Sequence, residues 1–138
     1  VLWPKDLSHA ENEDSILALV TVMKQTILLT GDASEKVEEA VVKDNPHLQF
    51  SILKAGHHGS RTSSGEALLK LVQPRVAFIS CGKHNHYGHP SPETLARLKA
   101  TGAIIFRTDQ DGQIRLRFTH EKLEVTTRVT KRKKELKQ

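Results

Sequence analysis

The sequence predicts a layered α/β or α+β fold, in which helices lie on one face of a mixed sheet. Three observations support this prediction. Short apolar runs alternate along the chain with segments of helical periodicity. Four consecutive apolar residues open the strand predicted at residues 76–80, which is typical of a buried central strand. The 138 residues suit one compact domain and leave little room for a second.

The predicted strands are short and rich in apolar residues. Lys24-Gln25 separates the first two of them, and this separation suits a two-residue hairpin. In the sixth strand Ile114, Leu116 and Phe118 alternate with arginines, so one face is apolar and the other is charged. The predicted strands cover residues 16–23, 26–30, 50–55, 76–80, 103–106, 113–118 and 122–129.

Three helices are predicted from their start and stop signals. Asp32 and Glu35 have the spacing of a capping box, and Ser63 and Glu66 repeat it. Ser91 precedes a proline, which suits an N-cap followed by the first helical position. The three helices end at Asn45-Pro46, before Pro74 and at Gly102, respectively.

The positive charge of the chain is confined to its end. The formal net charge is +5, yet residues 1–127 carry fifteen basic and fifteen acidic side chains. We therefore divide the chain into a domain over residues 1–129 and a basic, disordered tail over residues 130–138. A nucleic-acid or anionic-membrane contact by this tail is the less favoured alternative.

Several protein classes are excluded by composition. No apolar run reaches the roughly 20 residues that cross a bilayer, so we expect no membrane-spanning helix, and the opening residues lead us to expect no signal peptide. Cys81 is the single cysteine, which excludes an intrachain disulfide and a cysteine-rich zinc module. The first residue is Val1 rather than methionine, so we expect the chain to be a piece of a longer protein.

Three polar segments follow three of the predicted strands. They are residues 30–32, 56–60 and 82–90, and five of the eight histidines lie between positions 57 and 89. If those strands are parallel neighbours, an aspartate and several histidines share one crevice at the carboxyl ends of the strands. Oxygen and imidazole ligands together suit zinc, manganese or iron.

Each candidate residue also has a purely structural interpretation. Asp32 can cap a helix, and it can do so while binding a ligand. His57 and His58 are adjacent, so only one of them is expected to point at a given metal. His89 precedes a proline and is the most constrained of the later histidines. Cys81 is better explained as a buried small residue than as a nucleophile.

Four segments lie in order along the chain: LLTGD at residues 28–32, LKAGHHGSRTS at residues 53–63, YGHP at residues 87–90 and RTDQDG at residues 107–112. In these segments the chain resembles the ComEC competence proteins, and within them the C-terminal half of a metallo-β-lactamase-like domain. The resemblance covers most of residues 15–118. It implies that the chain is the second half of an αββα sandwich.

The resemblance also implies an activity and its setting. It implies a hydrolase that acts on phosphodiesters with one or two divalent ions, zinc or manganese, and that degrades the non-transported strand of incoming DNA. Single-stranded DNA and the membrane channel of the parent protein are then partners. The domain itself is expected to be soluble and on the outer side of the bacterial plasma membrane.

Roles follow for individual residues from the same resemblance. Asp32 matches the metal-bridging aspartate, and His89 matches the last metal-binding histidine. His57 and His58 match the GHHGS signature, where they act as a metal ligand or as a contact to substrate phosphate. We take His58 as the metal ligand of the pair. The residues expected to contact substrate are Lys54, Ser60 and Tyr87.

One departure from the family pattern is important. The principal metal motif, His-x-His-x-Asp-His or a variant ending in Asp-x-Asp-His, is absent from this chain. Asp32 and His89 alone would hold a metal weakly, because catalytic zinc sites usually have three protein ligands. We therefore expect the chain alone to be inactive, to need the N-terminal half of the domain, and to dimerise through an uncovered apolar sheet face.

Two other functions stay open from the sequence. One is a catalytically inactive module that binds single-stranded DNA. The neutral charge of residues 1–127 and the low aromatic content argue against it, since such surfaces combine basic and aromatic side chains. The other is a related metal-dependent hydrolase of a different substrate, because a fold does not determine a substrate.

Overall fold

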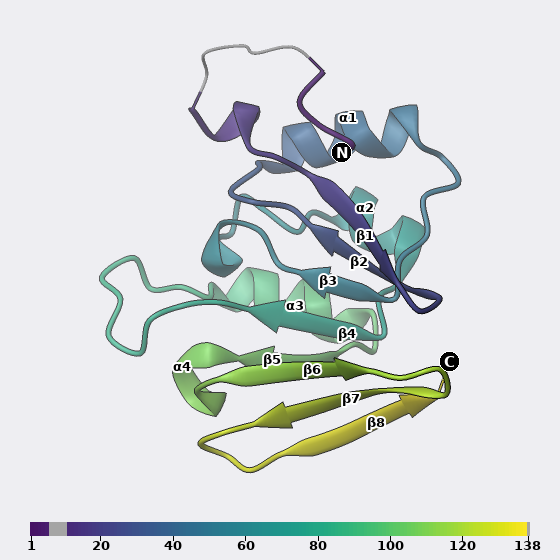
Figure 1. Cartoon of the computed structure of the whole chain (residues 1–138). Coiled ribbons are helices and arrows are strands. Elements are labelled where there is room, and N and C mark those ends of the chain that lie inside the picture. Colours follow the sequence, from purple (N-terminus) through teal and green to yellow (C-terminus); the bar gives the residue numbers. More distant parts are fainter. Residues whose placement is uncertain (6–10, 138) are drawn as a thin grey trace.

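A computed structural model describes residues 1–5 and 11–137. Its central element is a five-stranded sheet in the order β1-β2-β3-β4-β5 (Figure 1). Only the β1–β2 pair is antiparallel, and the three other pairs are parallel. The sheet is therefore mixed, as predicted. Its strands are β1 (Ala18–Val22), β2 (Gln25–Leu29), β3 (Ile52–Lys54), β4 (Val76–Ile79) and β5 (Ile104–Arg107).

The β1–β2 hairpin turns one residue earlier than the sequence predicts. Met23 and Lys24 form the turn, both with positive φ, as a two-residue hairpin loop of the primed type requires. Gln25 belongs to the strand instead. Its side chain is buried and its Oε1 accepts a hydrogen bond from the Ser51 hydroxyl at 2.8 Å. This tertiary contact, which lies 26 positions along the chain, decides the register.

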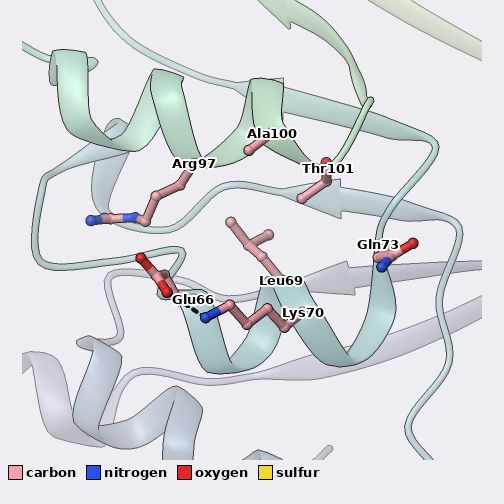
Figure 2. Close-up of a pocket in the computed structure, with 7 residues that line it drawn as sticks. All are labelled: Glu66, Leu69, Lys70, Gln73, Arg97, Ala100 and Thr101. Atoms are coloured by element: carbon pink, nitrogen blue, oxygen red, sulfur yellow. Dashed lines mark hydrogen bonds and ion pairs between the residues drawn. The ribbon is translucent and has the colours of Figure 1, made fainter.

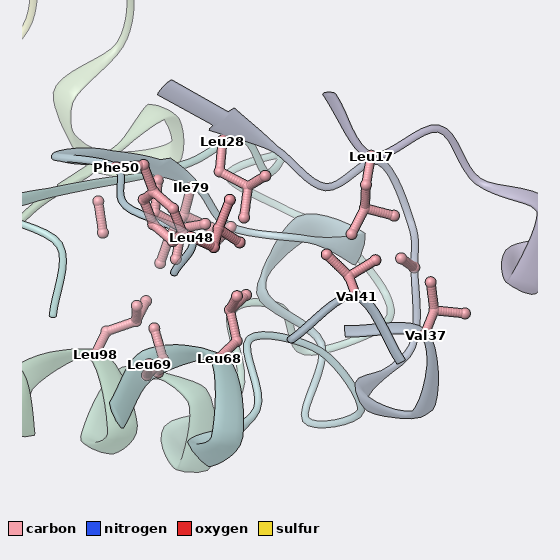
Figure 3. Close-up of a cluster of buried hydrophobic side chains, with 14 residues drawn as sticks. Leu17, Leu28, Val37, Val41, Leu48, Phe50, Leu68, Leu69, Ile79 and Leu98 are labelled. Carbon is pink, nitrogen blue, oxygen red and sulfur yellow. The ribbon is translucent and has the colours of Figure 1, made fainter. Parts of the chain in front are cut away.

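Three helices cover one face of the five-stranded sheet, which confirms the predicted layering. They are α1 (Glu35–Asp44), α2 (Glu66–Val72) and α3 (Pro92–Ala100). Their buried side chains pack on Leu28 and Ile79 from the sheet (Figure 3), and Leu53 belongs to the same cluster. The helical side of this core consists of Val37, Val41, Leu68, Leu69 and Leu98.

Two of the three predicted helix starts are shifted. The N-cap of α1 is Ser34 rather than Asp32, and the N-cap of α2 is Gly65 rather than Ser63. Ser63 is fully buried, and its hydroxyl donates to the Gly56 carbonyl at 2.8 Å, so tertiary contacts occupy it. Ser91 caps α3 as predicted, because its hydroxyl accepts the Thr94 amide at 3.2 Å.

A second sheet covers the opposite face of the first. Its strands are β6 (Ile114–Phe118), β7 (Lys122–Thr127) and β8 (Lys133–Lys137), all antiparallel. Phe78 and Phe106 of the first sheet stack with ring centroids 5.7 Å apart and pack with Leu123, Val125 and Leu136. The expectation of an uncovered apolar face is therefore wrong over β3, β4 and β5, since the chain folds its own last strands onto that face.

The predicted disordered tail is also corrected. Residues 133–137 form β8, which pairs with β7 over its whole length, and Leu136 is buried. The alternation of one apolar residue among lysines is a weak sequence signal, and the strand exists because β7 offers a free edge. Between β5 and β6, a short helix α4 (Thr108–Asp111) replaces part of the predicted turn.

Short 3-10 helices complete the chain: η1 (Glu11–Asp14) and η2 (His57–Gly59). Among the described residues, no helix has the length and apolar character of a membrane span.

Candidate functional site

The three predicted polar segments lie at one edge of the sheet. β2, β3 and β4 are parallel neighbours, so their carboxyl ends lie together (Figure 1). The first two segments are joined directly, because the His57 amide donates to the Gly31 carbonyl at 3.0 Å. The Thr30 hydroxyl adds a second link by donating to the Lys54 carbonyl at 2.9 Å. The predicted clustering is confirmed for these backbones.

Gly59 allows the second and third segments to touch. A Cβ at this position would lie 2.6 Å from Cβ of Pro90, and its φ of +82° disfavours other residues. The Ser91 amide donates to the Gly59 carbonyl at 2.8 Å across the same contact. The last glycine of the GHHGS segment is therefore required by packing against the residue after His89.

His57 and His58 adopt an uncommon backbone conformation. Their φ angles are 44° and 55°, in the left-handed region that costs on the order of 1 kcal/mol for a side chain with a Cβ. Hydrogen bonds within the turn hold them there, among them Gly59 amide to Gly56 carbonyl at 2.8 Å. Strain of this kind is concentrated at functional sites, so the observation supports a functional role for this turn.

Aromatic rings converge around His89. The His57 ring lies edge-on to it with centroids 5.8 Å apart, and the Tyr87 ring stacks on it at 5.9 Å. Tyr87 is 84% exposed, so its other face is open to solvent. The structure thus brings together three of the predicted site residues, from η2 and from the segment between β4 and α3.

His89 presents a polar atom without a partner. Its Nδ1 is buried and makes no hydrogen bond. Burial lowers the pKa of His89, and the neighbouring His57 and His58 lower it further. Neutral imidazole is the form that binds metal ions, and a buried ring nitrogen without a hydrogen bond is costly unless something binds it.

His58 differs from His57 in its surroundings. Its Nδ1 lies 2.6 Å from the Ser80 carbonyl at the end of β4, and its side chain is exposed. It lines a cavity of about 220 Å³ together with His89 and Tyr87. The two histidines diverge, as expected for adjacent residues: His57 contacts the His89 ring, while His58 borders the cavity next to it.

Lys54 ends β3, and Asp32 follows the end of the neighbouring strand β2. Lys54 is half-buried, and its ammonium donates to the Ala55 carbonyl at 2.8 Å. Burial lowers the pKa of Lys54, while the charge of Asp32 opposes that shift. The two side chains are thus close enough for their charges to interact. Since Asp32 caps no helix, its carboxylate is not committed to the structural role that the sequence left open.

Ser60 has a structural position. It is buried, and its hydroxyl lies 3.1 Å from the Thr62 hydroxyl. Its carbonyl accepts the Thr94 hydroxyl at 2.7 Å. These bonds shape the turn and link it to α3, and contact of Ser60 with a substrate stays a prediction.

The Cys81 thiol is hydrogen-bonded to a neighbouring carboxylate. Its thiol donates to the Asp109 carboxylate at 3.3 Å, and Arg107 pairs with that carboxylate at 2.6 Å. Burial and the Asp109 contact raise the pKa of the Cys81 thiol. A raised pKa reduces nucleophilicity at neutral pH, in agreement with the structural interpretation of this cysteine.

Three residues that support the site were not predicted from the sequence. Asn85 accepts the His89 amide at 2.9 Å and donates to the His89 carbonyl at 2.7 Å. Glu38 and Arg97 hold the segment that follows Ser60. Asn85 lies within the histidine-rich segment, four residues before His89, which is the one signal that could have indicated it.

The described residues do not form a complete metal site. No group of three or more His, Cys, Asp or Glu side chains is placed to hold an ion within residues 1–5 and 11–137. His57 and His89 converge, but two imidazoles are one ligand short of the usual catalytic set. The chain's own residues therefore fit part of a metal site and not a whole one.

A further cavity lies away from this site. It has a volume of about 270 Å³ and lies between α2 and α3 (Figure 2). Its lining residues are Glu66, Leu69, Lys70, Gln73, Arg97, Ala100 and Thr101, and none of them is a predicted site residue.

Comparison with known families decides what these segments belong to. The profile described as "Metallo-beta-lactamase superfamily" matches residues 3–84, which include the first two polar segments and the start of the third. The chain belongs to the metallo-β-lactamase superfamily. Superfamily members usually bind divalent metal ions and share a hydrolase fold. The mixed sheet with helices is consistent with this fold.

Curated relatives extend the similarity beyond that match. The chain is 36% identical over 109 residues to ComE operon protein 3 of Bacillus subtilis and 36% over 132 residues to Recombination protein 2 of Haemophilus influenzae. It is 37% identical over 105 residues to Competence protein ComA of Neisseria gonorrhoeae. These alignments cover 79%, 95% and 75% of this chain and 14%, 16% and 15% of the relatives. The resemblance to ComEC-type competence proteins is confirmed.

Proposed function

We propose that this metallo-β-lactamase-superfamily chain is part of a metal-dependent nuclease that degrades the non-transported strand during DNA uptake. The chain spans 14–16% of the length of the three relatives, so the activity belongs to a larger protein. Two of the three names, Recombination protein 2 and Competence protein ComA, refer to recombination and to competence. Both processes handle DNA, which supports a phosphodiester substrate over a small molecule.

The observation that carries the proposal is the state of His89. Its Nδ1 is buried without a partner, next to the His57 ring and beside the cavity that His58 lines. A purely structural histidine would normally have its buried nitrogen bonded. An open nitrogen surrounded by histidines at the carboxyl edge of a sheet is what a metal site needs.

The candidate residues divide into two groups. Asp32, His58 and His89 would contribute to holding one or two ions, zinc or manganese. When bound, such an ion lowers the pKa of a coordinated water and stabilises developing negative charge. Lys54 and the exposed Tyr87 would orient the substrate phosphate at the rim, with Ser60 shaping the turn between them.

The rest of the ligand set would come from the N-terminal half of the same domain. This follows from the incomplete set in the described residues. We further propose that the chain alone binds metal weakly and is inactive, and that the domain lies on the outer side of the membrane beside the channel of its parent protein. Homodimerisation of the chain alone would use the apolar groove where Ile27 and Leu29 meet Ile114 and Leu116.

The test uses a longer form of the protein that includes the principal metal motif. It is incubated with end-labelled single-stranded DNA and manganese or zinc, and the products are separated on a denaturing gel. Asp32→Ala and His89→Ala are expected to abolish cleavage, as is a chelator. Asp44→Ala and His47→Ala change exposed residues of the same types and should cleave normally.

The outcomes also separate the alternatives. DNA binding that survives Asp32→Ala, with no cleavage by a folded and metal-loaded protein, would replace the nuclease with a binding module. Metal-dependent hydrolysis of other esters without cleavage of DNA would indicate a related hydrolase of another substrate.

A further inference from the structure

We propose that the outer face of the three-stranded sheet binds the backbone of a nucleic-acid strand. The basic charge of the molecule is concentrated in the part of the chain that forms this sheet. Residues 113–138 contain nine lysines and arginines and three glutamates, whereas residues 1–112 contain twelve basic and thirteen acidic residues. Because β8 is an ordered strand, its lysines occupy defined positions on the sheet.

Strand alternation separates the two faces of this sheet. Ile114, Leu116 and Phe118 point toward the core, so Arg115 and Arg117 point outward. The register aligns Arg115, Thr126 and Lys133 in one row across the three strands, and it aligns Arg117, Glu124 and Glu135 in the next, with the β7 residue in the middle of each row. A third row pairs Lys122 with Lys137. The outer face therefore carries five cations and two carboxylates.

The two carboxylates are already neutralised by lysines. Lys133 pairs with Glu124 at 2.9 Å, and Lys122 pairs with Glu135 at 2.7 Å. Arg115, Arg117 and Lys137 form no ion pair with any described residue, and all three are exposed. Arg115 and Arg117 are about 7 Å apart along the strand. Unpaired cations at this spacing suit an extended polyanion.

The basic face continues toward the candidate site. The β7–β8 turn carries Arg128 and Lys131, both exposed. The Val129 amide in this turn donates to the carbonyl of Asp111, in α4, at 2.9 Å. Both α4 and the turn lie at the edge of the molecule that holds the segment between β4 and α3 (Figure 1). The link from this face to cleavage rests on the proposed function, but the binding itself does not.

A nucleic acid suits this face better than an anionic membrane. Peripheral membrane surfaces combine basic residues with apolar side chains that enter the lipid. Apart from the charged side chains, the outer face of the three strands offers only Thr126, with no apolar or aromatic residue. The contact expected is therefore electrostatic, without base specificity and with strong salt dependence.

The test is binding of this 138-residue chain to a fluorescein-labelled 20-nucleotide oligo-dT, followed by fluorescence anisotropy between 50 and 200 mM NaCl in EDTA. The double variant R115Q/R117Q removes two unpaired cations. Its slope of log affinity against log salt should be shallower by about 1.4, because each phosphate contact contributes about 0.7 for a single strand. Its affinity at 100 mM NaCl should fall at least fivefold.

The matched control is K43Q/K99Q, which removes two exposed lysines from α1 and α3. It should retain the wild-type affinity and slope, and circular dichroism should show that both variants are folded. Equal losses in both variants, or no loss in R115Q/R117Q, would overturn the proposal. So would preferential binding to vesicles of 30% phosphatidylserine. Because no metal is present, these results are independent of whether the parent protein cleaves DNA.

Discussion

Glu38 and Arg97 hold the opposite polar groups of one short segment, residues 61–65. The Glu38 carboxylate accepts the amides of Ser64 and Gly65 at 2.8 and 2.7 Å. The Arg97 guanidinium donates to the carbonyls of Ser64 and, at 2.8 and 2.9 Å, of Arg61 and Ser63. These hydrogen bonds fix residues 61–65 between α1 and α3. Because this segment directly follows the GHHGS turn, they also restrain the end of that turn.

Replacing Glu38 should destabilise the fold. Glu38 is 1% exposed, so Glu38→Ala leaves two amides without a partner inside the protein. We expect the free energy of unfolding to fall by about 3 kcal/mol in urea denaturation. Glu39→Ala, at the exposed neighbouring position, is the control and should change it by less than about 0.5 kcal/mol. A similar loss in both variants would mean that removing any carboxylate from α1 is destabilising, and that the hydrogen bonds of Glu38 to Ser64 and Gly65 are not responsible, since alanine itself favours the helix.

The same carboxyl should make stability depend on pH. Burial raises the pKa of Glu38 to about 7, although the Gly65 and Ser64 amides oppose the shift. When folding raises the pKa of an acid, the folded state holds the proton more tightly than the unfolded state does. The stabilisation from this group is therefore complete below its unfolded pKa, near 4.5, and it is lost as the pH rises through about 7. The loss attributable to Glu38 is roughly 3 kcal/mol.

This dependence is isolated by comparison with Glu38→Gln, which does not titrate. The difference in unfolding free energy between wild type and variant, measured in urea from pH 4.5 to 8, should shrink as pH rises. Using the difference removes contributions from His89, whose lowered pKa acts in the opposite direction. A difference that is constant with pH would show that Glu38 keeps an ordinary pKa.

Asn85 should position His89. Asn85→Ala removes the acceptor of the His89 amide and a donor to its carbonyl. Hydrogen exchange of the His89 amide should then be at least tenfold faster, and metal affinity of the longer protein should fall by about 10- to 100-fold. His86→Ala, an exposed change in the same segment, should alter neither quantity. Unchanged exchange in Asn85→Ala would refute the positioning role.

Arg132 should anchor the last strand. Its guanidinium lies 4.2 Å from the centroid of the Phe106 ring, pairs with the buried Asp111 at 3.2 Å and donates to the Ile105 carbonyl. Arg132→Ala should cost about 2 kcal/mol in thermal or urea unfolding. Arg128→Ala is the control, because Arg128 is exposed in the same turn. If the last residues were a disordered tail, both variants would be as stable as wild type.

The sequence allowed prediction of those features of the candidate site that lie within short segments of the chain. Asp32, His57, His58 and His89 follow strands in short segments, and the parallel order of β2, β3 and β4 follows from alternation of strands and helices. The ring contact of His57 with His89 could not be predicted, because it depends on the left-handed backbone at His57 and on the packing of Gly59 against Pro90.

Most strands and the helices α1, α2 and α3 could be predicted from the sequence, since hydrophobic periodicity and helix signals act between residues that are near in the chain. The ends of these elements, the surfaces that they cover and the existence of β8 depend on tertiary contacts. Gln25 joined a strand because Ser51 binds it, and Leu136 ordered the basic end because β7 and the apolar face beneath it were available. The free energy gained by burying such side chains depends on partners that are distant in the sequence, so no local sequence pattern predicts it.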